Sequence, residues 1–202
     1  MQVVTYPYGP LGSNMYYAET SAGKILIDPS VYPKRLSKKE MPSKIDYILI
    51  THGHFDHIDA IDKWNKLFPF ARIYISYDDL HCFKDPLYNC SIDFADPVTY
   101  DVHAFDIKDL DLPGLTVIRT PGHSKGGLCF LFEEGEDKVL FSGDTLFAGS
   151  VGRTDLTGGN TQEMIESLKK LRELDPSTQV YPGHGAKTSL ESEFRYNPFF
   201  NF

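Results

Sequence analysis

Three features are scarce in this chain of 202 residues. It has three cysteines, Cys82, Cys90 and Cys129, whose odd number and irregular spacing match neither a disulfide framework nor a paired-cysteine zinc motif. No apolar run approaches the roughly 20 residues that a membrane-spanning helix needs. The first residues show no basic segment followed by an apolar one, so no signal peptide is expected. These absences favour a cytoplasmic protein with reduced thiols and no membrane partner.

Basic residues are also outnumbered. The chain has 20 Lys and Arg residues against 28 Asp and Glu residues, which gives a formal net charge of -8. Non-specific nucleic-acid binding relies on Lys and Arg to displace counterions, so no nucleic-acid partner is expected. The hydrophobic content of 41% is that of an ordinary globular chain. The length allows one sizeable domain or two small ones.

The apolar pattern predicts short strands in runs, with helices between and after them. The expected strands are 15–20, 24–29, 45–50, 71–76, 115–120, 126–134, 138–143 and 178–183. The expected helices are 58–67, 160–174 and 189–197. In the second helix, Asn160 can act as the N-cap and Glu163 stands three residues on, as in a capping box. The irregular segment 85–100 is the expected boundary between two halves. This order favours β-sheets packed face to face in the core, with helices outside.

One short stretch concentrates residues that bind metals. "THGHFDH", residues 51–57, directly follows a predicted buried strand. It contains four ligand-type residues: His52, His54, Asp56 and His57. In an extended chain, residues two apart point to the same side, so His52 and His54 can converge on one ion. Asp56 and His57 fall where a helix should begin, point elsewhere and could serve a second ion.

Three later residues have similar settings. His123 in "TPGHSKGG", Asp144 in "FSGDT" and His184 in "YPGHG" each come just past a predicted strand. Ligands at strand ends can point into a common cleft, where a rigid scaffold fixes their geometry. A single histidine after a strand is more often a surface residue, and His81 and His103 are interpreted in that way. Seven ligand-type residues in such settings are hard to explain as coincidence.

The order of these motifs resembles the metallo-β-lactamase superfamily. "THGHFDH" is similar to its HxHxDH signature, and "TPGH", "SGDT" and "YPGHG" match its later metal motifs in order. "GDTLFAGSVGRTDLTGG" and "PGHGAKTSLESEFRYNPF" look like the short glyoxalase II-like hydrolases in that superfamily, the hydroxyacylglutathione hydrolase type. The resemblance implies an α+β fold, a four-layer αβ/βα sandwich in one domain over residues 1–202.

The resemblance also implies a division of the ligands between two metal ions. One ion would take His52, His54 and His123, the other would take Asp56, His57 and His184, and Asp144 would bridge them. Imidazole and carboxylate ligands without a thiolate suit Zn²⁺, Fe or Mn²⁺, of which Zn²⁺ is the first expectation. Asp56 and Asp144 are the predicted catalytic carboxylates.

The predicted chemistry is hydrolysis of a small-molecule thioester. Two metals about 3.5–4 Å apart can hold a hydroxide whose pKa is lowered towards about 7, and this hydroxide would attack the carbonyl. A thiolate leaving group has a pKa near 8.5, so no strong general acid is required. Arg153, in "GRTD", could bind a substrate carboxylate; a loop arginine bonded to backbone carbonyls is an equally good interpretation.

Other readings of the same residues stay open. Persulfide dioxygenases resemble the chain too, including "GRTD", but use one iron, for which His52, His123 and Asp144 would form a two-His-one-carboxylate triad. A metallo-hydrolase of another ester, lactone or amide is a further alternative, and a non-catalytic metal-binding module is the last. The sequence does not distinguish the acyl group, the thiol, the metal or the oligomeric state.

Overall fold

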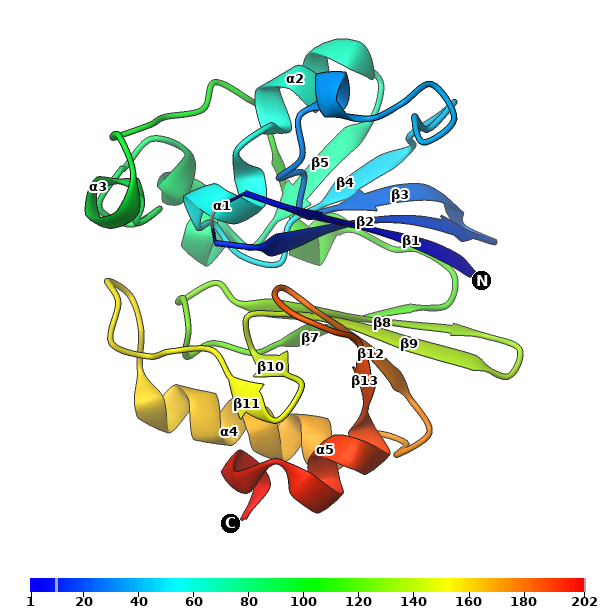
Figure 1. Cartoon of the computed structure of the whole chain (residues 1–202), viewed down its shortest axis with the longest axis vertical. Helices are drawn as coiled ribbons and strands as arrows, with labels where there is room; N and C mark the ends of the chain where they lie inside the picture. Colours follow the sequence, from blue (N-terminus) through cyan, green and yellow to red (C-terminus); the bar gives the residue numbers. More distant parts are fainter. Residues whose placement is uncertain (10, 202) are drawn as a thin grey trace.

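The chain folds into two β-sheets that face one another, with helices on both outer faces (Figure 1). The computed structural model describes residues 1–9 and 11–201. The first sheet has the order β1-β2-β3-β4-β5-β6, antiparallel from β1 to β3 and parallel from β3 to β6. Its strands are β1 (Gln2–Tyr8), β2 (Ser13–Thr20), β3 (Gly23–Ile27), β4 (Tyr47–Leu49), β5 (Arg72–Ile75) and β6 (Phe105–Asp106).

The second sheet has the order β13-β12-β9-β8-β7, in which only the β9 and β12 pair is parallel. Its strands are β7 (Leu115–Arg119), β8 (Leu128–Glu134), β9 (Asp137–Gly143), β12 (Gln179–Pro182) and β13 (Thr188–Ser189). A separate two-stranded hairpin consists of β10 (Leu146–Phe147) and β11 (Ser150–Val151).

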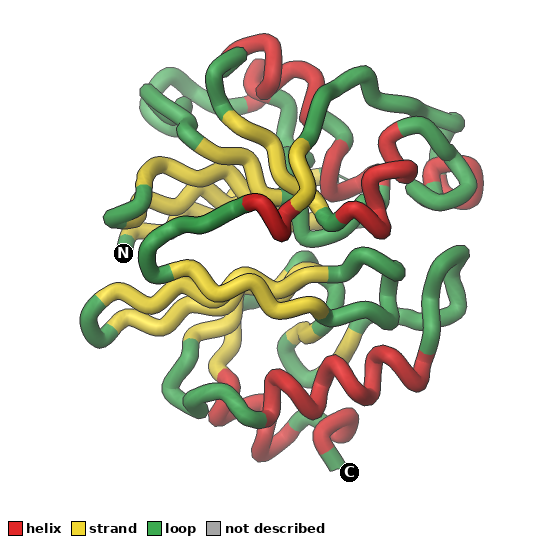
Figure 2. Tube along the Cα trace, turned by 180° about the vertical axis from the view of Figure 1, so that it is seen from behind, coloured by secondary structure: helices red, strands yellow, loops and turns green. Residues whose placement is uncertain are grey.

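Helices flank the two sheets, and Figure 2 shows the same arrangement from behind. The α-helices are α1 (Phe55–Ile58), α2 (Ile61–Leu67), α3 (Ser91–Phe94), α4 (Thr161–Arg172) and α5 (Leu190–Tyr196). The 3-10 helices are η1 (Pro33–Arg35), η2 (Tyr77–Phe83), η3 (Ile107–Asp109) and η4 (Pro198–Phe200). α2 lies outside the first sheet, and α4 and α5 lie outside the second (Figure 1). This is the predicted α+β sandwich, and the prediction of the fold is confirmed.

Side-chain alternation along the strands builds three apolar layers between the four structural layers. Ile48 faces α2 and packs with Trp64, whereas the next residue, Leu49, faces the second sheet and packs with Phe141 and its neighbours. Successive residues of a strand point to opposite faces, so a strand in this position must be apolar on both. A third layer holds β8, β9 and β12 against α4, for example Leu140 against Leu168.

Two predicted boundaries differ from the structure. The helix expected over 58–67 is two helices, α1 and α2, because the Ala60 N–H donates to the Pro29 carbonyl at 3.0 Å and interrupts the helical ladder. The predicted boundary between the two halves, 85–100, is wrong. β6 still belongs to the first sheet, so the chain crosses to the second sheet at 107–114. β6 has only two residues, too few to show an alternating pattern.

The start of α4 confirms half of the predicted capping box. The Asn160 side chain accepts a hydrogen bond from the Glu163 N–H at 3.1 Å, as an N-cap should. In a capping box the Glu163 side chain would accept a hydrogen bond from the Asn160 N–H. Here the Asn160 N–H donates instead to the Gly122 carbonyl at 2.8 Å. The cap therefore links α4 to the turn that precedes His123.

We expect Asn160→Ala to lower the free energy of unfolding by about 1 kcal/mol, because the first turn of α4 loses its side-chain acceptor. Glu163→Ala should have a smaller effect, because the Gly122 carbonyl, and not the Glu163 side chain, accepts the hydrogen bond from the Asn160 N–H. Urea unfolding followed by circular dichroism measures both. Equal losses in the two variants would contradict the assignment of the cap to Asn160 alone.

Candidate metal centre

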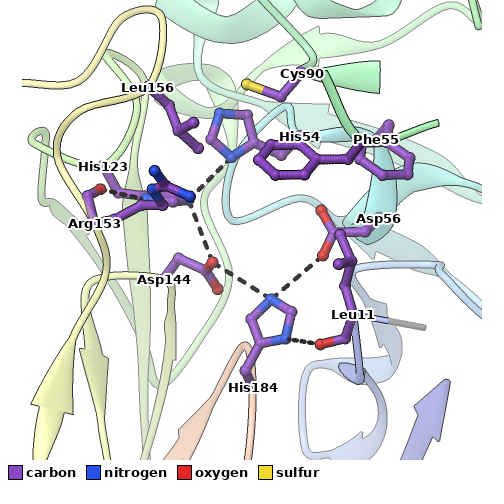
Figure 3. Close-up of a pocket in the computed structure, with 11 residues that line it drawn as sticks. Leu11, His54, Phe55, Asp56, Cys90, His123, Asp144, Arg153, Leu156 and His184 are labelled. Atoms are coloured by element: carbon purple, nitrogen blue, oxygen red, sulfur yellow. Dashed lines mark hydrogen bonds and ion pairs between the residues drawn. The ribbon is translucent and has the colours of Figure 1, made fainter. Parts of the chain in front are cut away.

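The seven ligand-type residues all lie at one edge of the sandwich, where strands of both sheets end. They reach it from β4 and α1, from the turn after β7, and from the ends of β9 and β12. Figure 3 shows His54, Asp56, His123, Asp144 and His184 around one cavity. Both sheets contribute, so the site exists only when the two halves pack together.

The first three-residue group is His52, His54 and His123. One ligand atom from each lies within 4.8 Å of the others. The His54 Nδ1 and His123 Nε2 atoms are 2.9 Å apart, and all three side chains are buried. The spacing brings three imidazoles close enough to share one ion.

The second group is Asp56, His57 and His184, whose ligand atoms also lie within 4.8 Å of one another. The His57 Nε2 and His184 Nε2 atoms are 3.2 Å apart, and His184 Nε2 is 3.3 Å from Asp56 Oδ2. The residues come from α1 and from the end of β12. The structure thus assembles the two groups that the resemblance implied.

Asp144 lies between the groups. Its Oδ2 is 3.2 Å from His123 Nε2 of the first group and 3.5 Å from His184 Nε2 of the second. Its Oδ1 is 3.3 Å from His57 Nε2. A side chain at Gly183 would collide with this carboxylate, so the glycine of "YPGHG" lets β12 approach the end of β9. The geometry is that of a carboxylate shared by both groups.

Unpaired polar atoms gather in this cluster. Among the described residues, four buried side-chain polar atoms have no hydrogen-bond partner: Ser30 Oγ, His52 Nε2, His54 Nε2 and Asp144 Oδ1. Three of the four belong to the cluster. Leaving a buried polar atom unpaired costs about 1–3 kcal/mol, so such atoms need an explanation. Divalent cations fit as the missing partners, since neutral imidazole and carboxylate are their ligands.

The pKa values of the cluster histidines fall into two groups. Burial, with the neighbouring histidines, lowers the pKa of His52 well below its ordinary value and that of His54 to about 3, so both rings are neutral and ready to coordinate. Burial also acts against the charged form of His57 and His184. There the Asp56 and Asp144 carboxylates prevail and raise the pKa of His57, and that of His184 to about 9.

Partners outside the cluster fix the orientation of four imidazoles. His123 Nδ1 donates to the Arg153 carbonyl at 2.7 Å, and His184 Nδ1 donates to the Leu11 carbonyl at 2.9 Å. His57 Nδ1 lies 3.0 Å from Asp28 Oδ2, and His52 Nδ1 lies 3.0 Å from a threonine hydroxyl. With Nδ1 engaged, Nε2 is the atom presented to the cluster.

Two buried aspartates that support the site were not singled out from the sequence. Asp28, after β3, accepts from Thr51 N at 2.7 Å and from Thr51 Oγ1 at 2.6 Å, besides contacting His57. A third possible ligand group, Asp28 with His52 and His57, overlaps the first two. We interpret Asp28 as a positioning residue, because both of its oxygens already accept hydrogen bonds. Its place directly after a strand was the signal that could have revealed it.

The second supporting aspartate, Asp79, lies within η2. It does not directly follow a strand, so its position in the sequence did not mark it as a site residue. Its Oδ2 accepts from Gly53 N at 3.0 Å and from Ser124 Oγ at 2.7 Å, and its Oδ1 accepts from Gly126 N at 2.6 Å. One carboxylate thus ties the loop of His54 to the loop of His123, and so holds the first group together.

A cavity of about 210 Å³ opens beside the cluster. Besides the cluster residues, it is lined by Leu11, Phe55, Cys90, Phe94, Arg153 and Leu156. The Arg153 side chain forms a two-point ion pair with Asp155, at 2.7 Å from Nε and 2.8 Å from one Nη. The predicted substrate-binding arginine therefore lines the cavity, with part of its guanidinium already engaged.

The histidines that were interpreted as surface residues lie outside the cluster. His81 contacts the ring of Tyr88, and His103 contacts the ring of Phe105. The three cysteines are free, and all are buried. Over residues 1–9 and 11–201, no helix is both long enough and apolar enough to cross a membrane.

Known proteins share this fold and arrangement. The family model of the metallo-beta-lactamase superfamily matches residues 8–184. A Bacillus subtilis (strain 168) protein described as a probable metallo-hydrolase is 31% identical over 208 residues, covering 96% of this chain and 95% of its own. The chain therefore belongs to the metallo-beta-lactamase superfamily, and it carries a histidine and aspartate cluster of the kind with which this family binds divalent metals.

Two solved structures match the whole chain closely. The BLEG-1 B3 metallo-beta-lactamase superposes with a TM-score of 0.89 at 32% identity, covering 100% of both chains. TTHA1623, solved in a di-iron-bound form, gives a TM-score of 0.85 at 35% identity, covering 97% of this chain and 99% of its own. The superfamily and the related metallo-hydrolase indicate a metal-dependent hydrolase.

We expect Asp28→Asn to weaken metal binding about 10–100-fold, because an amide cannot accept from both Thr51 and the His57 ring. Competition with a chromophoric chelator measures the affinity. Asp46→Asn is the matched control: Asp46 also accepts a backbone N–H, from Lys24 at 3.0 Å, but lies outside the cluster. Unchanged affinity in a folded Asp28→Asn variant would refute the positioning role.

Proposed function

We propose that this protein is a binuclear metal-dependent hydrolase that cleaves thioesters, of the hydroxyacylglutathione hydrolase type. The observation that carries the proposal is the pair of three-residue groups on either side of Asp144, with three unpaired buried polar atoms among these seven residues. One tetrahedral site does not need seven ligands, whereas two sites that share a carboxylate do. Zn²⁺ is the proposed metal, with Fe or Mn²⁺ as alternatives.

Divalent ions bound in such a site activate water as a nucleophile and polarise a carbonyl oxygen. The protein's own residues supply the positioning. The Asp144 carboxylate balances positive charge between the two groups, and Asp28 and the Arg153 carbonyl hold His57 and His123 in place. Asp56 lines the cavity and can accept the proton that the attacking water loses.

The cavity favours a leaving group that departs as an anion. Apart from the cluster residues, its lining offers one titratable proton donor, Cys90, and burial raises the pKa of that thiol to about 11. An amine or alkoxide leaving group needs a proton at the moment of cleavage, whereas a thiolate does not. A thioester is therefore the substrate class that this lining serves best.

Arg153 is the proposed contact for an anionic group on the thiol part of the substrate. Asp155 engages Nε and one terminal nitrogen of the guanidinium, so the other terminal nitrogen keeps its N–H donors for a ligand. This assignment agrees with the position of Arg153 beside His123 at the cavity (Figure 3).

The metal-loaded protein is expected to hydrolyse S-lactoylglutathione or a similar thioester. The loss of thioester absorbance measures the rate. A chelator should reduce the rate to the uncatalysed background, and added Zn²⁺ should restore it. A loaded sample that cleaves a β-lactam but no thioester would reject the thioesterase proposal. Oxygen uptake with glutathione persulfide and one iron per chain would instead support the dioxygenase reading.

Metal content should distinguish the shared ligand from a terminal one. Asp144→Asn keeps the size of the side chain but removes the charge next to two dications, so both ions should bind more weakly. His184→Ala removes a ligand of the second group only and should leave one ion in place, with reduced activity. After equal dialysis, elemental analysis counts the ions, which should number two in the unaltered chain.

The contrast between the two variants is the informative result. If Asp144→Asn keeps two ions, or if folded His184→Ala loses both, the assignment of bridging and terminal ligands is wrong. Circular dichroism of each variant shows whether it is folded. Saturation of the unaltered protein at one ion per chain would reject the binuclear site altogether.

A further inference from the structure

The cavity wall beyond the metal cluster is almost entirely apolar. Five of its six other lining residues are apolar or nearly so: Leu11, Phe55, Cys90, Phe94 and Leu156. They come from the β1–β2 turn, from α1, from the segment around α3 and from the loop after β11. Four segments that are remote in the sequence thus contribute similar side chains to one wall, beside the atoms proposed to react.

Two of these residues are exposed although they are large and hydrophobic. Leu11 has 44% and Phe94 47% of its surface accessible to solvent. Leu87, Tyr88 and Ile92, in the same segment as Phe94, are exposed as well but do not line the cavity. Scattered apolar residues on a surface are normal, but exposed apolar side chains that line a cavity mark a place where an apolar ligand removes them from water.

Apart from the ligand-type residues, Arg153 is the one charged residue in the described part of the cavity lining. Leu11 and Phe55 lie on the side of Asp56, whereas Arg153 lies across the cavity beside His123 (Figure 3). Among the described residues that line the cavity, Arg153 is the only lysine or arginine, and Asp155 already balances its charge. A substrate that bridges the cluster therefore meets a polar contact at one end and a hydrocarbon surface at the other.

We propose that the apolar side binds the acyl group of the substrate and that this group is an aliphatic chain rather than a short hydroxyacyl group. The inference rests on the proposed thioesterase function and specifies its substrate class. A cavity needs about 10–15 Å³ to hold one water molecule. A cavity of about 210 Å³ therefore has room for an aliphatic acyl chain of several carbons together with the reacting atoms.

A series of glutathione thioesters that differ only in the acyl group tests the proposal. From acetyl through butanoyl to hexanoyl, kcat/KM should rise about fourfold for each added methylene, the effect of burying one such group. The 2-hydroxypropanoyl thioester should be a poorer substrate than butanoyl. A kcat/KM that stays constant or falls along the series would overturn the proposal while leaving the thioesterase function intact.

Two variants identify the residues responsible. Leu11→Ser and Phe94→Ser should each reduce the increase in kcat/KM per methylene. The kcat/KM for the hexanoyl thioester should therefore fall more than that for the acetyl thioester. Ile92→Ser is the matched control, because Ile92 belongs to α3 and is 54% exposed but does not line the cavity. It should keep the full chain-length dependence. Equal losses for all acyl groups in Phe94→Ser would indicate a structural role and contradict the proposal.

A binding measurement separates this inference from the proposed function, because it needs no turnover. In Co²⁺-loaded protein, binding of acetate, butanoate and hexanoate, the carboxylate products that carry the acyl chain, is followed by the change in the visible spectrum. Affinity should rise about fourfold per methylene, and less in Leu11→Ser and Phe94→Ser. If these carboxylates show this dependence and no thioester is cleaved, the apolar subsite stands and the thioesterase function fails. Chain-length-independent affinity would overturn the subsite.

Discussion

A buried carboxylate surrounded by imidazoles is the constraint on which the site depends. Asp144 is within 3.5 Å of nitrogen atoms of His57, His123 and His184, which come from three other segments of the chain. A buried charge is stable only when it is paired, so these segments must arrive together or not at all. The face-to-face packing of the sheets meets this requirement, because β4, β9 and β12 all end at the same edge.

Supporting residues keep the cluster in order without belonging to it. Asp28 joins the end of β3 to Thr51 and His57, and Asp79 joins the loops of His54 and His123. Each aspartate satisfies backbone donors that would otherwise be buried and unpaired, so it stabilises the loops and the geometry of the site at once. This arrangement explains how a cluster built on loops can be rigid enough to bind ions.

Two kinds of residue line the cavity. Ligand-type residues supply nearly every polar group at its base, while Leu11, Phe55 and Phe94 supply hydrocarbon at its wall. Most ligand-type residues follow the ends of strands, whereas the wall residues come from turns and short helices. Leu11 and Phe94 lie outside the metal motifs, whereas Phe55 lies within "THGHFDH".

The sequence by itself determined the local features. Apolar runs followed by Gly, Pro, His or Asp marked the strands and their ends, because strand periodicity and turn chemistry are properties of neighbouring residues. Only the tertiary structure decided what meets across the sandwich. Asp28 contacts His57, and Asp79 accepts a hydrogen bond from Ser124, next to His123. The chain crosses between the sheets at 107–114, and Leu11 lies across the cavity from Arg153. Such contacts join residues far apart in the chain, and they arise from the packing of two sheets, which no local pattern records.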